Sequence, residues 1–148
     1  MLDLIISNSN LDNSIESRTF IGPTFRNIVI RNSSMEHIHH EAFMSLELET
    51  LLLHNVSVAD KVFTQAFDKV SAKKFEIRES SFNSIDTTAF DISVKNTLVL
   101  ESLLINELDR RAFYDIETKG SFLMSEIEIE SYENGALVLE IYSESVII

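Results

Sequence analysis

Large apolar residues recur along the chain every 23 or 24 residues, and each follows a small residue. The small residue is Ala in five of the six units and Thr in the first. Four more apolar columns keep the same register. The anchors of the pattern are Phe20, Phe43, Phe67, Phe90, Phe113 and Leu137. A period of this length predicts a solenoid, in which each repeat buries its apolar face against the next one.

Each unit also has two apolar residues two positions apart, upstream of the anchor. Because side chains alternate along a strand, such a pair predicts a short strand with one buried face. The pairs are Leu4/Ile6, Ile28/Ile30, Leu51/Leu53, Phe75/Ile77, Leu98/Leu100 and Phe122/Met124. No unit has a helical pattern of about 10 residues or more, so we expect irregular or short-helical return arms between parallel strands.

The repeat predicts a single domain of six units and a partial seventh strand. The units are 1–24, 25–47, 48–71, 72–94, 95–118, 119–142 and 143–148. The first strand begins within a few residues of Met1, and the pattern continues to the last residues. We therefore expect the chain to be a piece of a longer repeat protein, or a short gene product of a larger family.

The unit LETLLLHNVSV from Leu48, and IVIRNSSMEHIHHEAF ending at Phe43, resemble the leucine-rich repeat superfamily in its 24-residue extracellular type. That type reads L-x-x-L-x-L-x-x-N-x-L-x-x-I-x-x-x-A-F. The resemblance implies an α/β solenoid, mostly β, with a curved, horseshoe-like parallel sheet. It also implies an extracellular or cell-surface protein, from an animal, that binds other proteins.

The chain departs from this family at the inward asparagine. That column holds Ser9, Ser33, Val56, Ser80, Leu103 and Ile127, while asparagine comes one position early at Asn8, Asn32 and Asn55. Serine can make part of such a hydrogen-bonded ladder, but Leu103 and Ile127 cannot. The alternative fold is a right-handed parallel β-helix, in which a longer strand points the earlier column inward.

The strand residue between each inward pair is expected on the concave face. This column holds Ile5, Val29, Leu52, Glu76, Val99 and Leu123, and the column beside it holds Ser7, Arg31, His54, Arg78, Glu101 and Ser125. An apolar stripe beside a cationic patch is typical of a recognition surface. Strand propensity alone, or cover by a segment outside this chain, explains the stripe equally well.

Net charge is −12, which disfavours nucleic acid as a partner because phosphate backbones are repelled. No apolar run approaches the length of about 20 residues that a membrane helix needs, so no membrane insertion is predicted. The chain has no cysteine, which excludes disulfides and thiol catalysis.

The sequence predicts no enzyme, metal site or cofactor. In HIHH, only Ile38 belongs to an inward column, so His37 and His39 point outward without a set of further ligands. The acidic run SEIEIES (125–131) is interpreted as an exposed face. Nucleophile-elbow and phosphate-loop motifs are absent from the sequence, and glycine occurs only three times.

Two N-glycosylation sequons begin at Asn32 and Asn55, although chance alone gives about two in a chain of this composition. We therefore expect a non-enzymatic module that binds a protein partner through Val29, Arg31, Leu52, His54, Glu76, Arg78, Val99, Glu101 and Leu123. Two alternatives are a structural or self-associating segment and a non-catalytic subunit of an enzyme complex.

Overall fold

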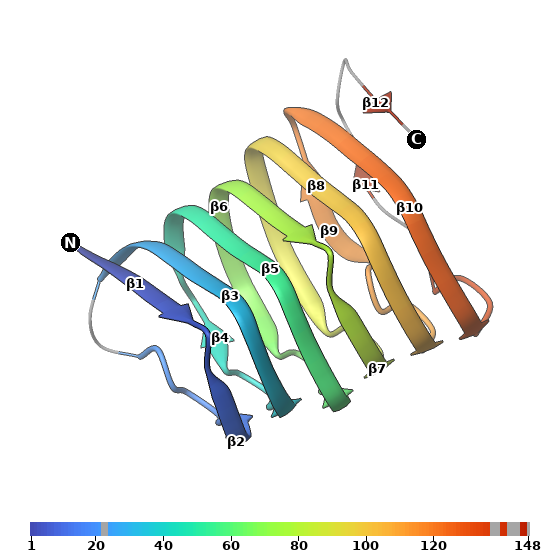
Figure 1. The fold of residues 1–148 in the computed structure, drawn as a ribbon. Helices are drawn as coiled ribbons and strands as arrows, with labels where there is room; N and C mark the ends of the chain where they lie inside the picture. The colour runs from blue at the N-terminus through green and yellow to red at the C-terminus, as the bar shows by residue number, and fades with distance from the viewer. Residues whose placement is uncertain (22–23, 137–139, 142–145, 148) are drawn as a thin grey trace.

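The chain folds as a parallel β-solenoid (Figure 1). The structure, a computed structural model, describes residues 1–21, 24–136, 140–141 and 146–147. Within these residues every paired strand is parallel to its neighbours, and there is no helix. The predicted solenoid of stacked parallel strands is confirmed.

Successive turns add strands to one sheet path. Its order is β1 (Leu2–Ser7), β3 (Phe25–Ile38), β5 (Glu47–Val62), β6 (Phe67–Arg78), β8 (Phe90–Leu108), β10 (Ser121–Tyr132) and β12 (Val146–Ile147). The shorter strands beside this path are β2 (Asn10–Ile15), β4 (Phe43–Met44), β7 (Ser81–Ile85), β9 (Asp115–Thr118) and β11 (Glu140–Ile141).

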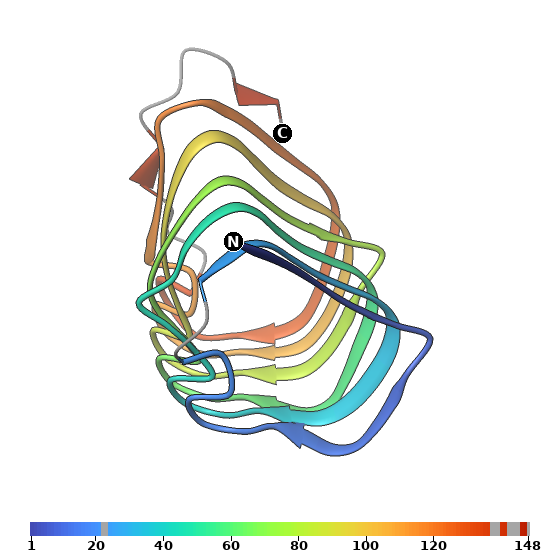
Figure 2. The same ribbon diagram turned by 90° about the vertical axis from the view of Figure 1, so that its left-hand side faces the viewer.

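Because the long strands bend at corners, the solenoid has three walls (Figure 2). The front wall contains residues 2–7, 27–31, 50–54, 74–78, 97–101 and 121–125. The second wall contains residues 10–15, 33–38, 56–62, 81–85, 103–108 and 127–132. The return wall contains residues 43–44, 67–72, 90–94 and 115–118.

The corner between the front and second walls explains the early asparagine column. The corner residues all have φ between 48° and 54°, and they are Asn8, Asn32, Asn55, Glu79, Ser102 and Glu126. Asparagine is among the few residues other than glycine that adopt this left-handed conformation readily. Asn32 and Asn55 are exposed, so this column turns the chain at the corner and does not point inward. The closed stack of parallel strands is otherwise compatible with the β-helix alternative.

The inward column one position later satisfies backbone groups with serine. Ser33 Oγ accepts a hydrogen bond from the Ser9 N–H at 3.3 Å and donates to the Arg31 carbonyl at 2.8 Å. Ser80 Oγ accepts from the Val56 N–H at 3.1 Å and donates to the Arg78 carbonyl at 2.7 Å. These serines therefore do the hydrogen-bonding work expected of an inward asparagine.

The interior is filled by the predicted anchors. The five described anchors are buried, and they are Phe20, Phe43, Phe67, Phe90 and Phe113; Leu137 lies outside the described residues. The alanine before an anchor sits in a tight turn, where its N–H donates to the carbonyl three residues back, as from Ala66 to Phe63 at 3.0 Å. Because this alanine is fully buried, the turn leaves no room for a larger side chain.

The return side is more regular than the sequence analysis expected. A second inward pair follows the anchor, namely Val70/Ala72 and Ile92/Val94 in successive turns, and all four side chains are buried. This period of two forms parallel strands, where irregular or short-helical arms were expected. Since the interior is closed, the surface predicted to be concave is the outer face of the front wall.

Candidate functional site

An apolar patch crosses the outer face of the front wall in the first three turns. Ile5 pairs in register with Val29, and Val29 pairs with Leu52. Ile5 is 58% exposed, and the other two side chains are half-buried. We refer to Ile5, Val29 and Leu52 as the apolar patch. The core does not depend on these side chains, because the strand neighbours of Leu52, Leu51 and Leu53, point inward and are fully buried.

The predicted apolar stripe is interrupted in the fourth turn. There Glu76 takes the place of an aliphatic residue, and it accepts a hydrogen bond from Arg78 Nε at 3.1 Å. Arg78 Nη1 also donates to Glu101 of the next turn. Val99 pairs in register with Glu76 and is only 3% exposed, although it faces away from the core. The stripe is therefore not continuous, since Leu123 lies beyond Val99 and apart from the apolar patch.

Carboxylates compensate most of the predicted cationic column. Burial works against the charge of Arg78, but hydrogen bonds and charges from Glu76 and Glu101 outweigh it and raise its pKa. His54 Nε2 lies 3.4 Å from Glu79 Oε1. Arg31 is different: it is exposed, and it makes no ion pair with the residues that the structure describes.

The opposite rim of the front wall carries matched charges. Arg26 holds Asp3 through two hydrogen bonds, of 3.0 and 2.7 Å, and the pKa of Asp3 is lowered mainly by this contact. Lys73 Nζ lies 2.8 Å from Glu49 Oε1, and this hydrogen bond lowers the pKa of Glu49. Because these pairs are exposed, they add little stability, but they leave the rim close to neutral.

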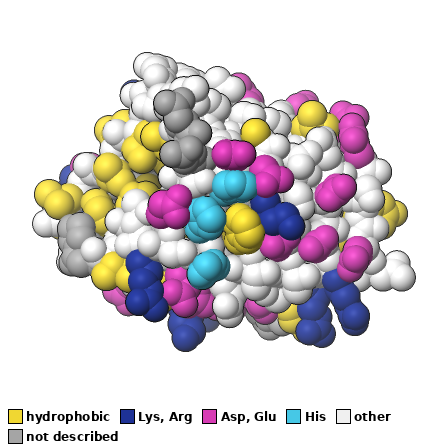
Figure 3. All heavy atoms as spheres, turned by 90° about the horizontal axis from the view of Figure 1, so that it is seen from below, with side chains coloured by type: hydrophobic (Ala, Val, Ile, Leu, Met, Phe, Trp, Pro, Cys, Tyr) yellow, Lys and Arg dark blue, Asp and Glu magenta, His cyan; other side chains and the backbone are white. Residues whose placement is uncertain are grey.

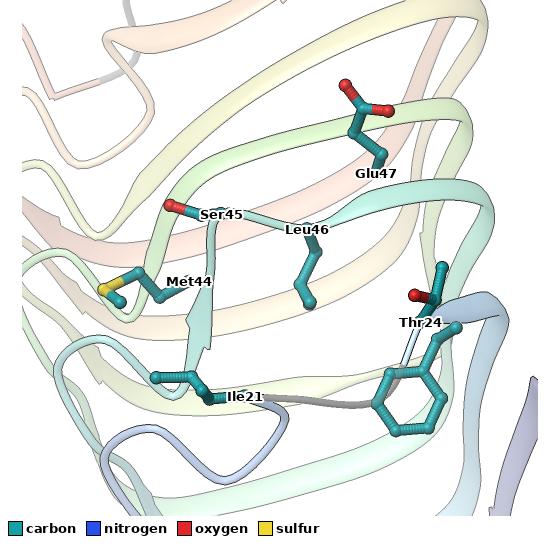
Figure 4. A pocket seen from close by; sticks show the side chains of 7 residues that line it. Ile21, Thr24, Met44, Ser45, Leu46 and Glu47 are labelled. Atoms are coloured by element: carbon teal, nitrogen blue, oxygen red, sulfur yellow. The ribbon is translucent and has the colours of Figure 1, made fainter.

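A groove of about 360 Å³ opens beside the first two turns (Figure 4). Its lining is mostly apolar, with Ile21, Phe25, Met44 and Leu46 beside Thr24, Ser45 and Glu47. Glu47 is the one titratable group among these residues. A single carboxylate cannot form a pair of groups with separated pKa values, so these lining residues supply no acid–base pair.

His37 lies on the second wall, and His39 and His40 lie in the turn after it. Figure 3 shows histidine side chains with acidic side chains around them. His37 Nδ1 lies 3.3 Å from Asp60 Oδ2, and His39 Nε2 lies 3.8 Å from Glu16 Oε1. The His39 ring stacks on Phe63 at 4.9 Å. Sequence reasoning missed these carboxylates, which come from the neighbouring turns. In the described part of the chain, no three such groups converge on a point that could hold a metal.

The two sequon asparagines form a ladder along the corner. Asn55 Nδ2 donates to Asn32 Oδ1 at 3.0 Å, and Asn32 Nδ2 donates to Asn8 Oδ1 at 3.2 Å. The recurrence of asparagine at the repeat period was the sequence signal for this ladder. Both sequon side chains are exposed. Their hydrogen bonds along the corner give them a structural role whether or not they carry a glycan.

No family model, curated protein or solved structure matches the chain. Within the described ranges, no helix is long and apolar enough to cross a membrane. The candidate site therefore rests on the geometry of the front wall.

Proposed function

We propose that the chain is a non-catalytic binding module that recognises a protein partner through the outer face of its front wall. The observation that carries this proposal is the apolar patch, three aliphatic side chains in register that are not needed by the core. An exposed aliphatic cluster of this kind favours association, because contact with a partner removes apolar surface from water.

The surroundings of the patch suit a binding surface. The backbone beneath it is held by parallel ladders on both sides of β3, so little ordering is needed when a partner binds. The mixed rim, with Arg26, Asp3, Glu49 and Lys73, resembles the polar border that surrounds the apolar centre of many interfaces.

The setting is a second part of the proposal. The resemblance to extracellular leucine-rich repeats supports a secreted or cell-surface protein of that superfamily, and the serine hydrogen bonds at Ser33 and Ser80 are consistent with its inward ladder. Asn32 and Asn55 are accessible for glycosylation. Secretion of the chain from animal cells, followed by mass measurement before and after glycosidase treatment, tests this part.

Partner capture with a matched pair of variants tests the binding face. Leu52→Lys places a charge in the apolar patch, and Leu104→Lys places one at a 40% exposed leucine on the second wall. We expect both variants to melt like the wild type, while Leu52→Lys alone loses its partners, because a buried interface charge must be desolvated. Equal capture by the two variants contradicts the proposal. Patch-dependent dimerisation in sedimentation would identify the partner as a second copy.

A further inference from the structure

We propose that the partner segment bound by the apolar patch is extended, aliphatic and acidic, with a carboxylate that pairs with Arg31. This inference rests on the proposed function, since it names the chemistry of the partner at the same face. Its basis is the position of an uncompensated guanidinium at the edge of the patch.

Arg31 stands apart from the other arginines of the front wall. Arg26 is held by Asp3, and Arg78 by Glu76 and Glu101. The register neighbours of Arg31 are Ser7 and His54, neither of which is a carboxylate. In a chain with 24 acidic and 12 basic residues, an arginine that forms no ion pair within the described residues distinguishes this face.

The spacing of the patch fits an extended ligand. Val29 and Arg31 lie two positions apart on β3, so both point to the outer face, about 7 Å apart along the strand. An extended peptide has the same period. A peptide that places an aliphatic side chain on Val29 and Leu52 can therefore place a carboxylate two positions further on, against Arg31.

Within contact distance of Arg31, the charges next to the patch affect a partner more than the net charge of the whole chain does. The net charge of −12 favours a cationic partner at long range, but physiological salt screens exposed charges over about 8 Å. Near the patch, Asp3 and Glu49 already hold Arg26 and Lys73. A guanidinium–carboxylate pair is also among the stronger hydrogen-bonded contacts, because the guanidinium fork matches the two oxygens of a carboxylate.

Peptide selection tests this inference. A display library of random 12-residue peptides is selected on the full chain, and each enriched peptide is measured against wild type, Arg31→Glu and Arg110→Glu. Arg110 is exposed in the turn after β8, so its variant makes the same change in net charge away from the front wall. We expect enriched peptides with Asp or Glu two positions from an aliphatic residue. Their affinity should fall at least about tenfold for Arg31→Glu and stay unchanged for Arg110→Glu.

The outcomes separate the two proposals. Peptides that need Leu52 but lack an acidic residue, or that bind Arg31→Glu as tightly as wild type, overturn the acidic partner and leave the binding face standing. Peptides that bind Leu52→Lys normally overturn both. Failure to enrich any peptide also counts against an extended segment as the partner, and leaves capture of folded proteins as the test of the face. Thermal melts confirm that each variant is folded, since Arg31 is exposed and outside the core.

Discussion

The rings of Phe43 and Phe67 lie parallel inside the solenoid, with centroids 4.5 Å apart and planes 4° apart. Phe90 continues the stack at 4.7 Å from Phe67, and Phe113 follows at 5.1 Å. Since each ring comes from a different turn, the stack couples the four turns that carry Phe43, Phe67, Phe90 and Phe113. The stability of one turn therefore depends on its neighbours.

Phe90→Ala should cost about 3–5 kcal/mol of unfolding free energy, because it removes a fully buried ring between two others. Phe20→Ala should cost much less, since Phe20 stacks on Phe43 alone among the anchors. Denaturant melts of both variants measure the difference. Equal costs would argue against a stack that is anchored by its central turns.

Asp91→Asn should stabilise the chain at neutral pH. Burial, the neighbouring Asp115 and Asp68 raise the pKa of Asp91, so the folded state disfavours its charged form. For a carboxyl with a raised pKa, stability is lost as pH rises through the folded pKa. The advantage of Asn should therefore shrink as pH falls and vanish below about 4, where Asp91 is protonated in both states. Thermal melts at pH 7 and pH 3.5 measure it.

Glu49→Gln serves as the control, because the pKa of Glu49 is shifted in the opposite direction to that of Asp91. The hydrogen bond from Lys73 lowers the pKa of Glu49, so its charge favours the folded state. This variant should show no gain at neutral pH. A gain as large as that of Asp91→Asn would mean that general relief of negative charge, and not the return wall, causes the effect.

Asn55→Ala should cost about 1–2 kcal/mol, because alanine adopts the left-handed corner poorly and cannot donate to Asn32. Asn55→Gly should cost less, since glycine accepts this φ freely. Ser57→Ala removes the sequon and keeps Asn55, so its stability should stay near that of the wild type. If Ser57→Ala is as costly as Asn55→Ala in glycosylated protein, a glycan and not the ladder stabilises the corner.

Replacing His37, His39 and His40 together with Gln should leave folding and metal content unchanged. His37 lies near Asp60 and Glu36, and His39 lies near Glu16, but no three such groups in the described residues converge on one point, as tight metal binding needs. Metal analysis after dialysis checks this. Stoichiometric zinc in the wild type that disappears in the triple variant would contradict it.

The period, the inward pairs and the anchors could be predicted from the sequence because burial repeats at a fixed interval. The return wall could not, because its inward residues after Phe67 are Val70 and Ala72, a run too short and too small to stand out among Lys69, Ser71 and Lys73. The left-handed corner was also missed, although asparagine recurring at Asn8, Asn32 and Asn55 was a signal for it, because asparagine adopts positive φ more readily than most residues.

At the candidate site, sequence reasoning expected Val29 and Leu52 on the solvent side of a concave sheet; in the structure their column lies on the outer face of a closed solenoid. It did not find that Arg78 bridges Glu76 and Glu101, or that Val99, the register partner of Glu76, is buried. The pairing of Arg78 with Glu101 joins side chains 23 residues apart. It depends on the register of the two strands and on the rotamers of both side chains, which a residue pattern does not give.

The central claim is that neighbouring turns pair in register along all three walls of a closed solenoid. The column of Val29 and Leu52 on the front wall therefore faces solvent. Disulfide trapping tests this directly, because the chain has no cysteine of its own. Val29 and Leu52 are register partners on the front wall, and Asp91 and Asp115 on the return wall. Neighbouring strands lie about 4.8 Å apart, within the range that a disulfide spans. We predict that both pairs, changed to cysteine, cross-link in the native state, and that the off-register pair Asp91→Cys with Glu117→Cys does not. A front-wall link without a return-wall link would contradict the closed solenoid and indicate a horseshoe with splayed return arms.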